Sequence, residues 1–274
     1  MTDYKKIKEY YSVFDEQHRL EKAEGRLEYE INLKIIFKYT DRSDNILDLG
    51  GGVGKYAIEL SKRGYRVTLA DLSEHLLEQA RDYIQENHIP ALQSIDVVNA
   101  VDLSCYESGS FDTVLLFGPL YHLLECDERE RCVSEVARVL KPKGIVLANF
   151  IPYLSGAEGV VTRALNFPDQ VNTENLSQVF LTGKFNNNAN RGFQEGYYPT
   201  SAEIEQLFSK FNFKKLLLRS IRSFGYGKEE KLFELLERDT VLFDKIMELI
   251  DSTAEDPAII ETCGHAVYVG YKEV

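Results

Sequence analysis

The chain has 274 residues, of which 44% are apolar, enough for one large domain or for a core domain with a smaller attachment. The net charge of −12 and the absence of a basic patch argue against nucleic acid as a partner. No apolar run approaches the roughly 20 residues needed to cross a bilayer, and the polar start Met1–Lys6 lacks the apolar core of a signal peptide, so we expect no membrane partner.

The cysteine pattern favours a cytoplasmic protein with reduced thiols. The four cysteines show no CxxC spacing. No HExxH motif and no Cys/His cluster is present, so the sequence predicts no metal site.

The first 150 residues alternate strand and helix patterns. Apolar residues at helical spacing predict two helices within residues 4–40. After them, Lys55–Arg63 is expected to be a helix ended by Gly64, and Ser73 is expected to cap a helix that runs to about His88. The predicted strands are 45–49, 65–70, 93–98, 112–117 and 145–150. This alternation is typical of a doubly wound α/β fold with a mostly parallel sheet.

Two further signals mark the second half of that region. Asp127–Glu130 resembles a capping box that opens a helix to Leu140, and Lys141–Gly144 is expected to be a turn. Beyond that region, the polar run that contains Asn186–Asn188 is either a flexible loop or a lid over a bound substrate.

The regular alternation of strand and helix patterns ends at residue 150. Residues 151–199 hold no strong strand pattern. A second capping box at Thr200–Glu203 is followed by a predicted helix to about Phe211 and a strand at Phe213–Ser220. Residues 228–250 look helical, and His265–Tyr271 is expected to be the final strand.

A glycine-rich turn follows the first strand, in Ile46–Gly54, and leads into a helix. Such a corner allows a ligand to approach the main chain closely. The sequence does not match the phosphate-binding P-loop motif, because Leu49 and Tyr56 occupy the positions where that motif requires a glycine and a Ser or Thr. A nicotinamide dinucleotide site remains an alternative, since Gly52–Ala57 matches GxGxxA and Asp71 follows at a suitable distance.

Several motifs in order over residues 46–150 support another ligand. Asp48–Gly54 matches DxGxGxG in full, Ser110–Asp112 reads Ser-Phe-Asp, Phe117–Leu123 follows the fourth strand, and Leu140–Gly144 reads Leu-Lys-Pro-Lys-Gly. In these motifs the chain resembles the class I S-adenosylmethionine (SAM)-dependent methyltransferases, in particular those that act on small molecules. The resemblance implies a Rossmann-like, mostly parallel seven-stranded sheet, with SAM as cofactor and S-adenosylhomocysteine (SAH) as product.

The resemblance also implies roles for residues that follow the strands. Asp48 would orient the loop or accept from the ammonium of SAM, and Asp71 would bind the ribose hydroxyls. Asn99 replaces the usual Asp at the adenine edge, so either Asn99 or Asp102 would contact adenine. The expected cofactor-binding residues are Asp48, Gly50, Gly51, Gly52, Asp71, Leu72, Asn99, Ala100, Phe117 and Gly118.

The sequence divides into four parts, which are an N-terminal helical cap (1–42), a SAM-binding core (43–150), an insertion or lid (151–199) and a C-terminal completion of the sheet (200–274). Aromatic residues in the cap and the insertion indicate a pocket for one small-molecule methyl acceptor. The candidate catalytic residues are His122 and Tyr11, and the candidate acceptor-binding residues are Tyr10, Tyr121 and Arg191.

The expected activity is methyl transfer by in-line displacement. The alternatives are an NAD(P)-dependent oxidoreductase and a noncatalytic SAM-binding protein. The sequence does not identify the acceptor, or whether N, O, S or C is methylated. It is compatible with a monomer or a homodimer.

Overall fold

A seven-stranded sheet forms the centre of the computed structural model, which describes residues 2–13, 22–186 and 195–273. The strand order is β3-β2-β1-β4-β5-β9-β8, and only β9 runs antiparallel to its neighbours. The strands are β1 (Asn45–Leu49), β2 (Arg66–Asp71), β3 (Ser94–Val97), β4 (Phe111–Leu116), β5 (Leu140–Phe150), β8 (Phe213–Ser220) and β9 (Ala266–Lys272). This arrangement confirms the predicted mostly parallel α/β fold.

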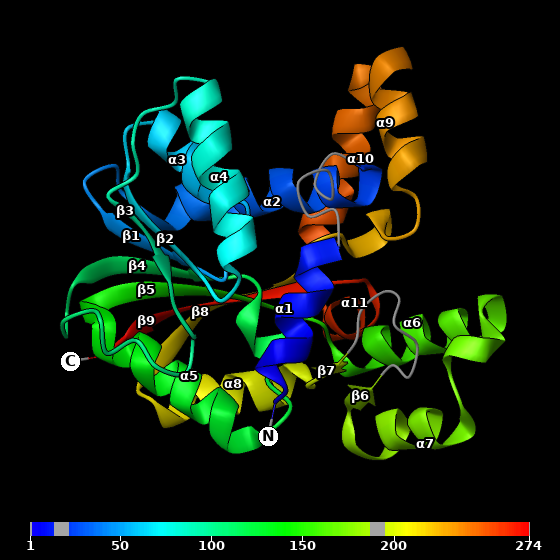
Figure 1. Cartoon of the computed structure of the whole chain (residues 1–274). Helices are drawn as coiled ribbons and strands as arrows, with labels where there is room; N and C mark the ends of the chain where they lie inside the picture. Colours follow the sequence, from blue (N-terminus) through cyan, green and yellow to red (C-terminus); the bar gives the residue numbers. More distant parts are fainter. Residues whose placement is uncertain (1, 14–21, 187–194, 274) are drawn as a thin grey trace.

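Helices cover both faces of the sheet (Figure 1). One face carries α2 (Ala23–Tyr39), α3 (Lys55–Lys62) and α4 (Glu74–Glu86), and the other carries α5 (Cys126–Val139) and α8 (Ser201–Lys210). Side chains alternate along each strand, so the two faces have separate apolar clusters. In β1, for example, Leu47 and Leu49 pack toward α5, while Ile46 packs toward α2 and α3.

The remaining helices stand at one end of the sheet (Figure 1). They are α1 (Tyr4–Val13), α6 (Tyr153–Asn166), α7 (Thr173–Thr182), α9 (Glu229–Arg238), α10 (Thr240–Thr253) and α11 (Pro257–Thr262). Short strands β6 (Lys184–Asn186) and β7 (Glu195–Tyr197) pair next to α6 and α7. Single 3₁₀ turns occupy Pro119–Tyr121 (η2), Pro168–Gln170 (η3) and Ser223–Gly225 (η4). The region after β5 has its own apolar cluster, which includes Val160, Val179 and Phe185.

Several local predictions hold. Ser73 caps α4, and Thr200 and Glu203 form the expected capping box at the start of α8. Others are wrong. The helix α5 begins at Cys126 rather than within the expected capping box, and Glu125 at its N-cap makes no side-chain capping bond. Residues 228–250 are helical as expected, but they form two helices, because Asp239 leaves the helical conformation and its side chain accepts from Leu242 N at the start of the second helix.

Two strand boundaries also differ from the sequence-based expectation. The expected turn at Lys141–Gly144 is the irregular beginning of β5, where the register with β4 shifts and Lys143 has a φ of 66°. The insertion contains the β6–β7 hairpin pair, whose strands are too short to leave a periodic signal. None of the helices within the described ranges is long and apolar enough to span a bilayer.

Candidate functional site

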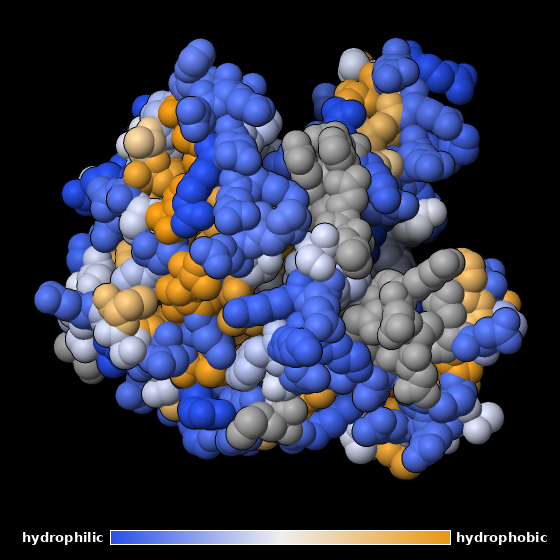
Figure 2. Space-filling model, in the orientation of Figure 1, coloured by the Kyte–Doolittle hydropathy of each residue, from blue (hydrophilic) through white to orange (hydrophobic). Residues whose placement is uncertain are grey.

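A pocket of about 220 Å³ lies outside the carboxyl ends of the parallel strands. Open α/β sheets bind ligands at this edge. All of the predicted site residues that the structure describes line it, namely Tyr10, Tyr11, Asp48, Gly50, Gly51, Gly52, Asp71, Leu72, Asn99, Ala100, Phe117, Gly118, Tyr121 and His122. Arg191 lies outside the described residues. Figure 2 shows a mostly hydrophilic face on which hydrophobic side chains gather between α4 and α5.

The glycine turn is built so that its main chain is open to the pocket. Gly50, Gly52 and Gly54 have φ values of 75°, 55° and 74°, a region that L side chains rarely adopt. A Cβ on Gly50 would lie 2.5 Å from Cδ of Pro119. A Cβ on Gly118 would lie 3.1 Å from the carbonyl oxygen of Gly50, which is a tight contact, so the two segments pack closely against each other.

Asp48 supplies a buried carboxyl group beneath this turn. Its Oδ2 accepts a hydrogen bond of 3.1 Å from Ala57 N. Its Oδ1 is buried and has no hydrogen-bond partner among the described residues. Burial raises the pKa of Asp48 to about 7, the bond from Ala57 lowers it, and the charge of Asp71 raises it further. A buried hydrogen-bond acceptor without a donor destabilises the folded protein, unless a ligand supplies the donor.

Asp71 links the glycine turn to the start of α4. Its Oδ2 accepts from Gly52 N at 2.8 Å, and its Oδ1 accepts from Ser73 N at 2.8 Å. These two bonds fix the orientation of the carboxylate, which lines the pocket. The helix cap itself is Ser73, whose Oγ accepts from Leu76 N, so capping does not account for Asp71.

The two candidates for the adenine edge differ in position. Asn99 lines the pocket, and its Oδ1 accepts from Val101 N at 3.2 Å. Asp102 is exposed and does not line the pocket, and its Oδ1 accepts from Ser104 N. Asn99 is therefore the residue of the two that a ligand in this pocket can reach.

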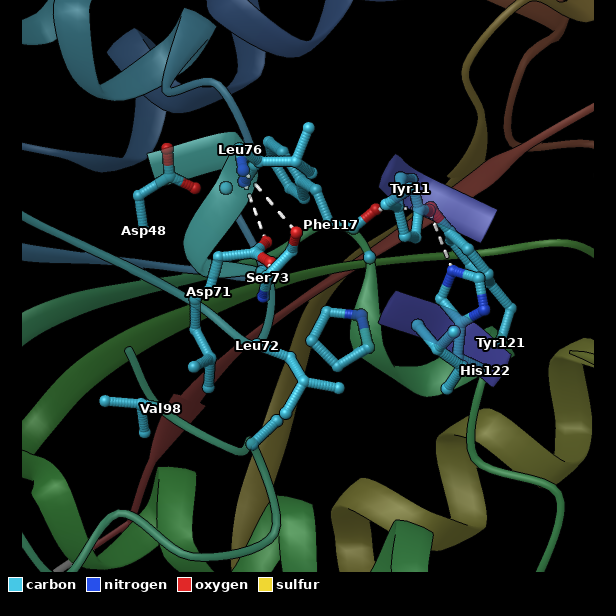
Figure 3. A pocket seen from close by; sticks show the side chains of 18 of the residues that line it. Tyr11, Asp48, Asp71, Leu72, Ser73, Leu76, Val98, Phe117, Tyr121 and His122 are labelled. Carbon is cyan, nitrogen blue, oxygen red and sulfur yellow. Dashed lines mark hydrogen bonds between the residues drawn. The ribbon is translucent and has the colours of Figure 1, made fainter. Parts of the chain in front are cut away.

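Aromatic side chains form the opposite end of the pocket (Figure 3). Tyr11 Oη lies 2.9 Å from His122 Nε2, and the Tyr10 ring meets the Tyr11 ring edge to face. Tyr121 Oη donates to the carbonyl oxygen of Phe117 at 3.3 Å. In Figure 3 the Tyr11–His122 pair stands opposite Asp48 and Asp71, so one pocket joins a carboxylate end and an aromatic end.

His122 is neutral at physiological pH. Desolvation lowers its pKa to about 4, and a hydrogen bond with the backbone of Glu195 opposes this only in part. A neutral ring that donates one N–H to a carbonyl has its other nitrogen free to accept. Tyr11 therefore donates its hydroxyl hydrogen to His122 Nε2.

Contacts from distant parts of the chain hold α1 over the pocket. Thr2 N and Oγ1 donate to the buried carboxylate of Glu128 on α5. Lys6 Nζ lies 2.6 Å from Glu195 Oε1 and 3.2 Å from Asn186 Oδ1, which joins α1 to both short strands of the insertion. The N-terminal helix and the insertion thus meet at the aromatic end of the pocket.

Sequence reasoning missed one polar pair at this pocket. His265, just before β9, lines the pocket, and its Nδ1 lies 2.6 Å from Oε2 of Glu28 on α2. The available signal was Glu28 itself, because it falls on the apolar face with Leu27 and Ile31 and a buried carboxylate needs a partner. Nothing in the sequence placed His265 next to it. Among the described residues no group of three or more His, Cys, Asp or Glu could hold a metal ion.

Comparison with known proteins identifies the core. Residues 47–148 match the family model described as a methyltransferase domain. The methyltransferase GfsG of Streptomyces halstedii is 35% identical over 100 residues, which are 36% of this chain and 34% of that protein. The chain therefore matches about a third of the length of this curated relative.

Solved structures share the fold over more of the chain. A SAM-dependent methyltransferase from Methanosarcina mazei has a TM-score of 0.61 at 20% identity and covers 88% of this chain and 97% of its own. The 1,6-didemethyltoxoflavin-N1-methyltransferase of Burkholderia thailandensis has a TM-score of 0.58 at 14% identity, covering 98% and 85%. Residues 47–148 thus match a methyltransferase domain, and the whole sheet has the fold of solved SAM-dependent methyltransferases.

Proposed function

We propose that the protein transfers a methyl group from SAM to a small-molecule acceptor. The observation that carries the proposal is one pocket that joins the glycine turn and Asp71 to an aromatic end. SAM, when bound, supplies a methyl group already activated on a sulfonium, so the protein's main task is to align acceptor and methyl group.

The carboxylate end fits the amino acid and ribose parts of SAM. The unpartnered Oδ1 of Asp48 is suited to accept from an ammonium, which would also favour the charged form of that buried carboxyl. The Asp71 carboxylate, which lines the pocket, is suited to accept from the two ribose hydroxyls. The glycine turn lines the pocket with main chain, which supports close approach of the methionine part.

The adenine ring is proposed to lie between Leu72 and the segment after β3. Ala100 N would donate to the ring, and Asn99 Oδ1 would accept from its amino group. Asn99→Ala should weaken SAH binding, and Asp102→Ala should not, because only Asn99 lines the pocket. Isothermal calorimetry with SAH compares the two variants directly, and equal losses would contradict this assignment.

The acceptor is proposed to lie against Tyr10, Tyr11, Tyr121 and His122 at the aromatic end, with Phe117 and Gly118 next to the sulfonium. A base works best when its pKa is near the operating pH, and the value of about 4 for His122 is too low for that. We therefore assign Tyr11 and His122 to shaping and orienting the acceptor site.

The N-terminal cap (1–42) and the insertion (151–199) are proposed to determine acceptor choice, with the segment that contains Arg191 as a candidate lid. The ion pair between Lys6 and Glu195 supports a shared role, since it joins the two at the pocket. A cytoplasmic location is proposed from the free thiols of Cys105, Cys126, Cys132 and Cys263. A monomer and a homodimer both fit the proposal.

Incubation with methyl-labelled SAM and a broad panel of small molecules tests the activity. Mass spectrometry should detect a labelled product together with SAH. Binding of SAH without transfer to any acceptor class would favour the noncatalytic alternative. Binding of NADH or NADPH in place of SAH would favour the oxidoreductase alternative.

A further inference from the structure

A carboxylate–imidazole pair lies at the aromatic end of the pocket and has no part in the assignments above. His265 Nδ1 is 2.6 Å from Glu28 Oε2, and the His265 and Glu28 side chains are 24% and 8% exposed. His265 lines the same pocket as Tyr121 and Ile151. The pair is therefore covered by protein on the Glu28 side and open to the pocket on the His265 side.

The geometry assigns the two ring nitrogens different tasks. An ionised carboxylate can only accept, so Nδ1 of His265 carries the hydrogen in the bond to Glu28. Nε2 then carries a lone pair, and the described residues form no hydrogen bond with it. The ring of Tyr121 stacks on that of His265, with centroids 6.0 Å apart and planes at 10°, which helps to fix the plane of the imidazole.

Packing on the other sides also restrains His265. The preceding Gly264 has a φ of 76°, and a Cβ there would lie 2.6 Å from Nη2 of Arg222. Arg222 is itself paired with buried Glu229 at 3.0 Å. Within the described ranges, Glu28 from α2 is the residue that makes a hydrogen bond to the His265 ring, and the Arg222–Glu229 pair lies across Gly264.

The contrast with His122 distinguishes the two histidines of the pocket. Nε2 of His122 already accepts from Tyr11, and its ring also bonds the backbone of Glu195. His265 has a carboxylate hydrogen-bonded to Nδ1, and its second nitrogen faces no protein partner in the described chain. His265 is therefore the better placed of the two to receive a proton from a ligand.

We propose that His265 is the general base of the reaction, that Glu28 positions and supports it, and that the acceptor is a planar phenol or enol. This rests on the proposed methyl transfer. The acceptor O–H bond breaks and its proton goes to Nε2 of His265, while the new O–C bond forms and the electron pair of the methyl–sulfur bond stays on sulfur. The positive charge gained by the imidazole is compensated by Glu28.

The class of acceptor follows from the lining and from the base. Tyr10, Phe117 and Tyr121 offer aromatic faces that pack well against a planar conjugated ring. A phenol or enol is neutral until it loses its proton, so it gains from a base, whereas a thiolate or a carboxylate does not. A base next to aromatic walls thus selects hydroxyl groups on flat, conjugated molecules.

The first test reads the tautomer of His265 and requires no acceptor. Nitrogen-15 NMR of histidine-labelled protein with SAH bound should show His265 protonated at Nδ1 and unprotonated at Nε2, with the signal assigned by its loss in His265→Gln. Glu28→Gln should shift this signal, and His75→Ala on the exposed surface of α4 should not. A ring protonated at Nε2 in the wild-type complex overturns the proposal.

The second test separates this proposal from the activity on which it rests. Calorimetry with SAH is run on the wild type and on every variant. If the wild type does not bind SAH, the proposed function itself is contradicted. With binding intact, transfer to a panel of phenols and 1,3-diketones should fall about 100-fold or more in kcat in His265→Gln, with KM little changed. Glu28→Gln should lower kcat in the same way, and Glu30→Gln should not.

Two outcomes of the second test would overturn the role of His265. One is an unchanged kcat in His265→Gln. The other is SAH binding in the wild type without transfer to any phenol or enol of the panel. A His265→Gln protein that no longer folds would also fail to bind SAH, and the tautomer of the wild-type ring then decides.

Discussion

Replacing Asp48 with asparagine should stabilise the ligand-free protein while weakening its binding of SAM and SAH. Burial raises the pKa of Asp48 from 3.8 to about 7. The native state therefore holds this proton more tightly than the unfolded state, so the free energy of unfolding falls as the pH rises from 3.8 to about 7. Above that range the cost of the buried charge is present in full.

The size of the effect follows from the same pKa values. A rise from 3.8 to about 7 corresponds to an upper limit of about 4 kcal/mol at about 1.36 kcal/mol per pH unit. Asparagine removes the charge but adds a buried N–H₂ group where Oδ1 has no partner among the described residues, at a cost of about 1–3 kcal/mol. We expect Asp48→Asn to gain about 1–3 kcal/mol at pH 8. At pH 4 the charge cost is below about 1 kcal/mol, so the cost of the buried N–H₂ group should make the variant less stable than the wild type.

Urea unfolding at several pH values measures this difference, with the exposed Asp102→Asn as control. The same variant should bind SAH about 10- to 100-fold more weakly, since a hydrogen bond to a charged group contributes about 1.5–3 kcal/mol. A variant that is less stable than wild type at pH 8, or a difference that does not change with pH, would refute the account of Asp48.

Three further substitutions test other parts of the site. Gly50→Ala should lower the free energy of unfolding by about 1–2 kcal/mol because of the positive φ, and it should abolish SAH binding measurable by calorimetry. Gly109 also has a positive φ, of 70°, but open space surrounds it, so Gly109→Ala should lower stability without affecting SAH binding. Tyr11→Phe should leave SAH affinity unchanged and lower kcat about 10- to 100-fold, and equal kcat would contradict its role next to the acceptor. Tyr56→Phe should destabilise the protein by about 1–3 kcal/mol in thermal unfolding because Asn32 Nδ2 loses its acceptor; no change in Tm would show that water replaces it.

Local patterns were enough to predict the parts of the fold that rest on short-range rules. The strand at Phe213–Ser220 contains a short apolar run, and the cap at Ser73 follows from hydrogen bonding within a few residues. The start of α5 was missed because Glu125 precedes it without a capping bond. The break at Asp239 was missed because the helical pattern continues across it.

The two ends of the pocket also differ in how far they could be predicted from local sequence patterns. The carboxylate end could be predicted because its residues directly follow strands, and a parallel sheet brings those positions together. The pair of Glu28 and His265 joins residues 237 positions apart, and no local pattern encodes such a contact. The aromatic end also depends on how α1 lies over the pocket, which long-range bonds such as Thr2 to Glu128 fix.

The most direct test of the central claim is isothermal calorimetry of the wild-type protein with SAH and, separately, with NADH and NADPH. The account predicts saturable binding of one SAH per chain and no binding of either nicotinamide cofactor. Saturable binding of NADH or NADPH without binding of SAH would contradict it.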